Sequence, residues 1–163
     1  MVQPAPPSWA DIVRDTERRG PEPVRDGHDT AALVAAFPEL GAVTTRTPAI
    51  DGAGSPVPAR LYLPERPVPD VALVWVHGGA YIWGDLDGPE SNWVGLALAA
   101  RGIPVLCLDY RKALNGLHHP ALSDDVLAGL TWATAHADSL GVTADRLHLG
   151  GASAGANLAC GVA

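Results

Sequence analysis

The sequence has little positive charge, few cysteines and no long apolar run. Eleven basic against eighteen acidic residues give a formal net charge of −7, which argues against binding nucleic acid or an anionic membrane surface. We expect no membrane span, because no apolar run is long enough and the N-terminus lacks the apolar core of a secretory signal. Cys107 and Cys160, the only two cysteines, stand in apolar contexts, which favours a reduced, cytoplasmic protein. Neither CxxC nor HExxH spacing occurs, so the sequence predicts no metal and no cofactor.

What the sequence does contain is enough apolar material for a core. Apolar residues make up 47% of the 163 residues, which excludes wholesale disorder and fits one domain. Twelve of the fifteen prolines lie before residue 70, where we expect short elements joined by stiff turns. The elements predicted there are a helix over 9–19 that begins with a Ser8–Asp11 capping box, a helix from 29 or 30 to Pro38, and strands over 42–48 and 57–63.

After residue 70 the pattern alternates between buried strands and helices. Such alternation is typical of an α/β fold with a mostly parallel sheet, right-handed crossovers and flanking helices. The predicted strands are 71–76, 103–108 and 146–149. The predicted helices are 92–101, a helix from Ser123 as its N-cap to about 137 with Leu127 in its apolar stripe, and one that begins at Ala154.

The strongest local signal is a G-x-S-x-G pattern between a strand and a helix, Gly151-Ala152-Ser153-Ala154-Gly155. A strand that ends in such a sharp turn projects the serine hydroxyl at the carboxyl edge of the sheet, and the crowded turn needs flanking glycines. The free N–H groups of the following helix favour negative charge there. The pentapeptide alone also fits a glycine-rich turn without chemistry, or one that holds a phosphate.

The second signal is His77-Gly78-Gly79-Ala80-Tyr81, directly after the strand predicted at 71–76. Two glycines at a strand end let the backbone turn its N–H groups into a cavity, which acyl transfer needs where the tetrahedral oxyanion forms. Alone, the motif is equally an ordinary loop with a structural histidine. A nucleophile turn and a donor turn at the carboxyl ends of neighbouring parallel strands are more specific, because open sheets place their sites there.

Four motifs in order resemble the hormone-sensitive-lipase-like family of α/β-hydrolases, which are carboxylesterases and lipases. They are HGGA (77–80), Asp109-Tyr110-Arg111, Pro120-Ala121-Leu122 with Asp124-Asp125, and GGASAGANLA (150–159). The resemblance implies an α/β-hydrolase fold truncated after the nucleophile elbow, with cap helices in 1–40 and the N-terminal half of the core in 41–163. It implies hydrolysis of a small-molecule carboxylic ester through an acyl-enzyme.

The resemblance also assigns roles residue by residue. Ser153 matches the nucleophile, and the backbone N–H groups of Gly79, Ala80 and Ala154 match the oxyanion donors. His77 and Gly78 match the support of the oxyanion loop. Three departures stand out: Ala80 replaces the last glycine of HGGG, Ala152 replaces the acid before the serine, and the segment 112–119 differs from the family's L-A-P-E-H-P-F-P.

The family's catalytic acid and histidine follow the nucleophile in chain order, and only ten residues follow Ser153. All six histidines precede it, and none has the spacing of a catalytic base. We therefore expect an N-terminal part of a longer enzyme, with feeble or no esterase activity as residues 1–163. It would need the C-terminal half or a complementary chain, and the full-length form could be a homo-oligomer.

Two alternatives belong to other functional classes. A non-catalytic small-molecule receptor on a hydrolase scaffold would bind a ligand without covalent labelling of Ser153. A dinucleotide-binding domain would use Gly150, Gly151 and Gly155, but G-x-G-x-x-G spacing is missing there. Tyr81 and Trp83 fit either an apolar acyl pocket or plain core.

Overall fold

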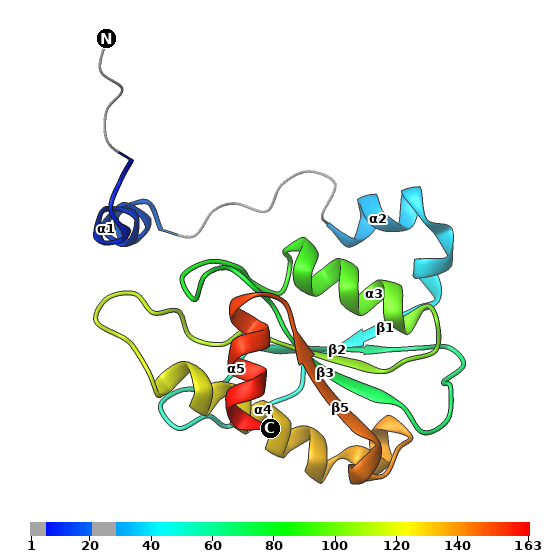
Figure 1. The fold of residues 1–163 in the computed structure, drawn as a ribbon. Helices are drawn as coiled ribbons and strands as arrows, with labels where there is room; N and C mark the ends of the chain where they lie inside the picture. The colour runs from blue at the N-terminus through cyan, green and yellow to red at the C-terminus, as the bar shows by residue number, and fades with distance from the viewer. Residues whose placement is uncertain (1–5, 21–28) are drawn as a thin grey trace.

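A computed structural model describes residues 6–20 and 29–163, which fold around one five-stranded sheet (Figure 1). In spatial order the strands are β1 (Thr44–Arg46), β2 (Ala59–Leu63), β4 (Val105–Leu108), β3 (Ala72–Val76) and β5 (Leu147–Gly151). The α-helices are α1 (Trp9–Arg19), α2 (Thr30–Ala36), α3 (Val94–Ala99), α4 (Ala121–Ala135) and α5 (Ala154–Val162). Short 3₁₀ turns are η1 (Pro38–Ala42), η3 (Ala137–Leu140) and η4 (Ala144–Arg146), and η2 (Pro89–Trp93) is a π-helical turn.

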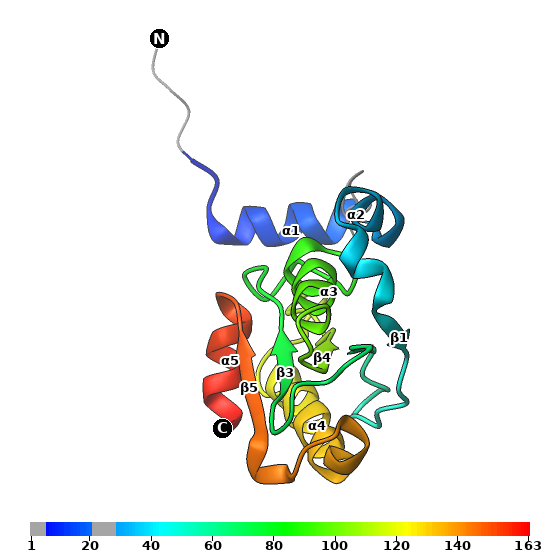
Figure 2. The ribbon, with the colours of Figure 1, turned by 90° about the vertical axis from the view of Figure 1, so that its right-hand side faces the viewer.

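The strand directions confirm the predicted α/β architecture with a mostly parallel sheet. β3 pairs in parallel with both β4 and β5, whereas β2 is antiparallel to β1 and to β4. Only β2 therefore runs against the other four. The carboxyl ends of β3 and β5 consequently meet at one edge of the sheet, and Figure 2 shows α1 lying across that edge.

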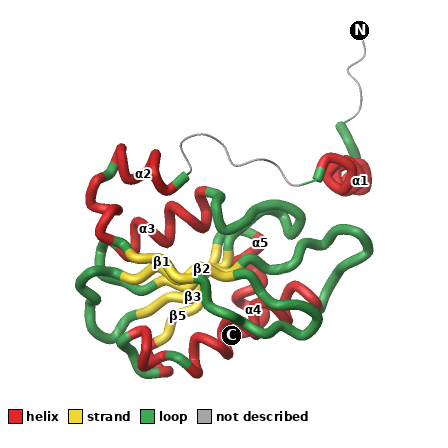
Figure 3. Tube along the Cα trace, turned by 180° about the vertical axis from the view of Figure 1, so that it is seen from behind, coloured by secondary structure: helices red, strands yellow, loops and turns green. Residues whose placement is uncertain are grey.

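Helices cover both faces of the sheet, as the tube in Figure 3 shows. Because side chains alternate along a strand, β4 divides its residues between two cores. Leu106 and Leu108 pack in the larger cluster with residues of α4 and α5, while Val105 and Cys107 pack in a smaller one with Leu96 of α3. Leu33 of α2 and Leu40 of η1 extend this smaller core.

The first two helices follow the sequence signals that predicted them. α1 spans Trp9–Arg19, and its capping box is complete: the Ser8 hydroxyl accepts from the Asp11 amide and the Asp11 carboxylate from the Ser8 amide. The Asp29 side chain caps α2 by accepting from the Ala32 amide at 2.6 Å. The chain from Pro38 continues as η1, which the sequence did not predict.

The predicted start of α4 is wrong by three residues. The helix begins at Ala121 with Pro120 at its N-cap, so Ser123 lies inside the first turn and caps nothing. The predicted apolar stripe is also wrong at Leu127, which is 48% exposed. Asp125 is buried because Arg111 binds it across the chain, and this fixes which face of α4 turns inward. None of the helices in the described residues is long and apolar enough to cross a membrane.

Candidate active site

Ser153 occupies a strained turn between β5 and α5. Its backbone angles are φ 49° and ψ −117°, a region that costs a non-glycine residue about 1–3 kcal/mol. The Ala152 amide before it donates to the Val76 carbonyl at 3.0 Å, which ties the turn to the end of β3. Ser153 itself is exposed, and no hydrogen bond within residues 6–20 and 29–163 involves its hydroxyl. The serine at the centre of G-x-S-x-G therefore stands at the sheet edge, open to a ligand.

The two flanking glycines are needed because the turn touches the neighbouring strand end. A Cβ on Gly155 would lie 2.2 Å from the Val76 carbonyl oxygen and 2.3 Å from that of His77. A Cβ on Gly151 would lie 2.6 Å from the Val76 oxygen. The space that a glycine-rich phosphate loop would leave for a ligand is filled here by main-chain carbonyls, which disfavours the dinucleotide alternative.

The loop after β3 is held in an unusual backbone conformation. Gly79, Ala80 and Tyr81 have consecutive positive φ angles of 118°, 51° and 69°. A Cβ on Gly79 would meet the Trp83 carbonyl oxygen at 2.1 Å, so only glycine fits there. The positive φ of Ala80 is one that a small non-glycine residue can adopt. Ala80 in place of the family's glycine therefore keeps the turn.

The amides of this loop differ in what they bind. The Gly78 N–H donates to the Glu90 carboxylate at 2.6 Å and is therefore occupied. In the part of the chain that the structure describes, the N–H groups of Gly79, Ala80 and Ala154 donate no hydrogen bond. The three amides predicted as oxyanion donors are thus the unengaged ones, and they flank the contact between the two turns.

His77 lies beneath the loop, 1% exposed. Its Nδ1 is 2.5 Å from the Gly78 carbonyl oxygen, and its ring stacks on Tyr110 with centroids 4.7 Å apart. The Tyr110 hydroxyl donates to the His77 carbonyl at 3.1 Å, and burial raises the pKa of that hydroxyl well above its usual value. His77 therefore contacts the loop through the Gly78 carbonyl.

A charged pair not predicted from the sequence lies beside His77. Lys112 Nζ donates to Asp109 Oδ1 at 2.5 Å, and both atoms are within 3.4 Å of His77 Nε2. Burial alone would raise the pKa of Asp109, but the adjoining His77 ring and the Lys112 ammonium hold it below its ordinary value. The sequence signal that could have pointed to Lys112 is that it is the chain's sole lysine, in a segment that departs from the family pattern.

The Asp-Tyr-Arg and Asp-Asp motifs meet as one structural unit. Asp125 accepts from the Arg111 guanidinium through both carboxylate oxygens and from the Arg111 amide at 2.8 Å. The hydrogen bonds to Asp125 raise the pKa of Arg111 further. This pair fixes the loop after β4 to α4 and does not reach Ser153.

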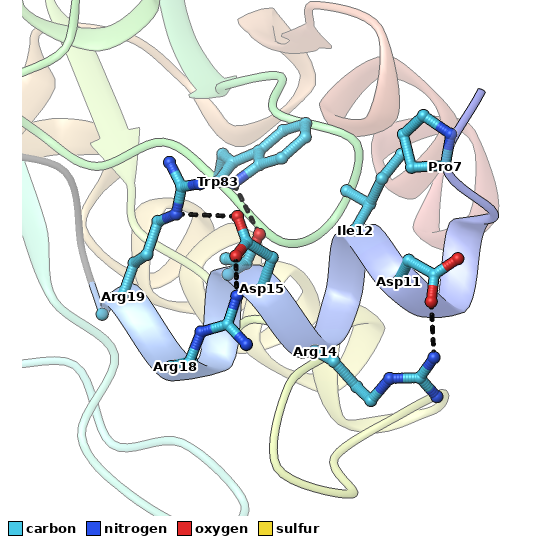
Figure 4. A pocket seen from close by; sticks show the side chains of 10 residues that line it. Pro7, Asp11, Ile12, Arg14, Asp15, Arg18, Arg19 and Trp83 are labelled. Carbon is cyan, nitrogen blue, oxygen red and sulfur yellow. Dashed lines mark hydrogen bonds and ion pairs between the residues drawn. The ribbon is translucent and has the colours of Figure 1, made fainter. Parts of the chain in front are cut away.

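Helix α1 lies above the loop and forms a pocket with it (Figure 4). The Trp83 indole N–H donates to the Thr16 hydroxyl at 3.2 Å, and the backbone N–H of Asn115 donates to the Glu17 carboxylate at 2.6 Å. The pocket has a volume of about 540 Å³ and is lined by Pro7, Asp11, Ile12, Arg14, Asp15, Thr16, Arg18, Arg19, Gly20 and Trp83. Trp83 is 40% exposed and faces this pocket, so it is not plain core.

None of the histidines within the described residues contacts Ser153. His118 Nδ1 is 2.8 Å from the His119 carbonyl, and His136 stacks on Trp132 in α4. His148 lies within β5, and His28 falls outside the described residues. No group of three His, Cys, Asp or Glu side chains that could hold a metal ion occurs in the ranges 6–20 and 29–163.

Comparison with known proteins bears directly on this arrangement. A family model described as alpha/beta hydrolase fold matches residues 73–163, which include both turns. The ethyl acetate hydrolase of Pseudomonas putida is 38% identical over 109 residues, covering 65% of this chain and 34% of that protein. Esterase LipI of Mycobacterium tuberculosis is 34% identical over 130 residues, covering 77% of this chain and 39% of that protein.

A solved structure agrees with the sequence matches. Esterase LipW from Mycobacterium marinum superposes with a TM-score of 0.66 at 34% identity, covering 85% of this chain and 44% of that one. The chain thus spans between a third and a half of each of these relatives. With the elbow, the glycine loop and the mixed sheet in place, the chain belongs to the alpha/beta hydrolase fold family, as the hormone-sensitive-lipase-like motifs indicated.

Proposed function

We propose that the whole protein hydrolyses carboxylic esters through an acyl-enzyme formed on Ser153. The observation that carries this proposal is the serine itself: exposed, strained, and on a turn packed against the end of β3, after which Gly79 and Ala80 have unengaged amides. The esterases among its relatives support the same reaction class. Because the P. putida relative is an ethyl acetate hydrolase, a short acyl ester is the first substrate to test.

The reaction uses the nucleophile of one turn and the backbone amides of both. Ser153 Oγ attacks the ester carbonyl as a general base takes its proton, and the carbonyl oxygen becomes a tetrahedral oxyanion. The N–H groups of Gly79, Ala80 and Ala154 stabilise that oxyanion, and loss of one such donor typically costs about 2.7–4 kcal/mol in the transition state. The alcohol leaves with the proton from the base, and water then releases the acid from Ser153 by the same steps.

We further propose that the general base and its carboxylate partner come from residues outside 1–163. Support comes from the histidines of the described residues, none of which reaches Ser153, and from the family's order of nucleophile, acid and histidine. Residues 1–163 alone would then keep the nucleophile and the oxyanion donors without the base. Loss of such a base lowers the rate by about 10⁴ to 10⁶.

Two finer assignments complete the proposal. Helix α1 acts as part of a cap within residues 1–40, which its position across the carboxyl edge and its contact with Trp83 support. The two free cysteines, Cys107 buried and Cys160 exposed, support a reducing compartment such as the cytoplasm.

The test is covalent labelling of Ser153 by a fluorophosphonate, followed by hydrolysis of p-nitrophenyl acetate. Protein made from the complete reading frame should be labelled once and should turn over the ester, and both should disappear in Ser153→Ala. Ser139→Ala removes the hydroxyl of another exposed serine, in η3 and away from the elbow, and should change neither. Stoichiometric ligand binding without labelling would instead support the receptor alternative. Rapid ester turnover by residues 1–163 alone would refute the assignment of the base.

A further inference from the structure

The single lysine of this chain is half-buried beside the loop that carries the oxyanion donors. Ten other basic residues are arginines, so Lys112 stands out in the sequence. Its side chain is 20% exposed, and Nζ lies 4.5 Å from the centroid of the Tyr110 ring. Nζ is 2.5 Å from Asp109 Oδ1, 2.6 Å from the Tyr110 carbonyl and 3.4 Å from His77 Nε2.

These contacts account for every proton of the ammonium group. A lysine ammonium has three N–H donors and no acceptor, and three acceptors surround Nζ: a carboxylate, a carbonyl and a ring nitrogen. A protonated Nε2 would instead donate to Asp109 Oδ1, 3.3 Å away, and would turn its N–H toward the Lys112 ammonium. Because Lys112 already donates to that oxygen, we assign Nε2 as an acceptor without a proton. On the other side of the ring, Nδ1 is 2.5 Å from the Gly78 carbonyl, which can only accept, so Nδ1 carries the proton. Both contacts are met by one form of His77, the neutral Nδ1–H tautomer.

This tautomer matters because of which peptide unit it holds. The Gly78 carbonyl and the Gly79 N–H belong to one trans peptide, so they point in opposite directions. A hydrogen bond that holds the carbonyl toward His77 thus aims the Gly79 N–H away from His77. The Gly78 N–H is fixed separately by the Glu90 carboxylate at 2.6 Å, so the peptides on both sides of Gly78 are held.

We propose that Lys112 is a positioning residue for ester hydrolysis: it keeps His77 in the neutral Nδ1–H tautomer, and His77 in turn orients the Gly79 amide that receives the oxyanion. This inference rests on the proposed function. Lys112 stands where the family pattern has an apolar residue, so the proposed role is specific to the sequence of this protein.

Without Lys112, His77 would face a single carboxylate. Four ionisable groups lie around the ring and the loop that it holds: Asp109 and Lys112 at Nε2, Tyr110 stacked on the ring, and Glu90 on the Gly78 amide. With Lys112 removed, Asp109 favours a proton on Nε2. The ring then either becomes an imidazolium or moves its proton from Nδ1 to Nε2. The second change leaves a bare Nδ1 against the Gly78 carbonyl, which repels it and turns the peptide.

Nitrogen NMR of the histidine side chains tests this step directly in the 163-residue chain. ¹⁵N shifts distinguish Nδ1–H, Nε2–H and imidazolium forms, and His77→Asn identifies the His77 signals. At pH 7 the parent should show His77 as neutral Nδ1–H, and Lys112→Met should show protonated Nε2. A parent His77 that carries a proton on Nε2 at pH 7 overturns the proposal without any Lys112 variant. An unchanged tautomer in a folded Lys112→Met also overturns it.

A double variant separates the charge effect from lost packing. Lys112→Met with Asp109→Asn removes both charges, and the Asn amide can donate to Nε2, so His77 should return to Nδ1–H. Failure to return would mean that Lys112 acts only through packing, which overturns the proposal.

In protein from the complete reading frame, Lys112→Met should lower kcat toward acetyl esters about 10- to 100-fold with KM unchanged, and the double variant should recover most of the loss. An unchanged kcat would overturn the positioning role. Absence of Ser153 labelling in every variant would refute the proposed function instead, while the NMR result would still report the His77 tautomer.

Discussion

Replacing Gly155 with alanine adds one methyl group, which should push the elbow at Ser153 away from the loop after β3. In Gly155→Ala the added Cβ would lie 2.2 Å from the Val76 carbonyl oxygen and 2.3 Å from the His77 carbonyl oxygen. Both atoms belong to the main chain at the end of β3, which cannot move aside as the tip of a flexible side chain could. The elbow and the donor loop must therefore shift apart.

The expected size of the effect follows from two opposing contributions. Forcing a methyl group into a packed site costs about 3 kcal/mol at the upper end of the observed range. Alanine is better than glycine in a helix by at most about 1 kcal/mol, and Gly155 lies in the first turn of α5. The net loss is about 2 kcal/mol, which for a domain of this size lowers Tm by about 4–8 °C.

The same helix supplies the control. A Cβ on Gly161 would meet nothing within 4 Å, so Gly161→Ala should leave Tm unchanged or raise it slightly. The assay is thermal unfolding of both variants followed by far-UV circular dichroism, with fluorophosphonate labelling of Ser153 as a second measurement in the complete protein. Gly155→Ala should be less stable than Gly161→Ala and should be labelled more slowly. Equal Tm values for the two variants would refute the steric argument for the G-x-S-x-G glycines.

Three further predictions concern the surroundings of the site. Arg111→Met leaves the buried Asp125 carboxylate without its ion-pair partner and should destabilise the fold by about 3–5 kcal/mol in urea denaturation, whereas a loss below about 1 kcal/mol would contradict a buried pair. The pKa of Asp109 is lower in the folded state, so the stability it contributes is present above its unfolded pKa and is lost as the pH falls through the folded value. Asp109→Asn should therefore make the free energy of unfolding fall less steeply below about pH 4. The same steepness in the variant and the parent would contradict this. Thr16→Val removes the acceptor of the Trp83 indole N–H and should change tryptophan fluorescence with little effect on Tm, because α1 buries no residue of its own.

The sequence by itself determined the features whose signals are local. Ser8 and Asp11 are three residues apart, and their reciprocal capping bonds set the start of α1 where the pattern predicted it. The alternation of apolar strands and helices predicted the α/β sheet, and G-x-S-x-G predicted the turn at Ser153. In each case the signal lies within a few consecutive residues, although the strands that pair and the elbow's contact with Val76 join distant parts of the chain.

Only the tertiary structure decided which distant groups meet. From the sequence, Asp125 is predicted to be an acidic residue in the first turn of a helix capped by Ser123. In the structure it binds Arg111, fourteen residues earlier, and that contact buries it. Glu90 and Lys112 carry no local signal for a role at the Gly78 peptide, since the one binds its amide and the other reaches its carbonyl only through His77. Such contacts depend on where β3, β4 and the loops after them bring the chain together. A propensity or a motif spacing cannot encode them, because the partners become neighbours only once the sheet has formed.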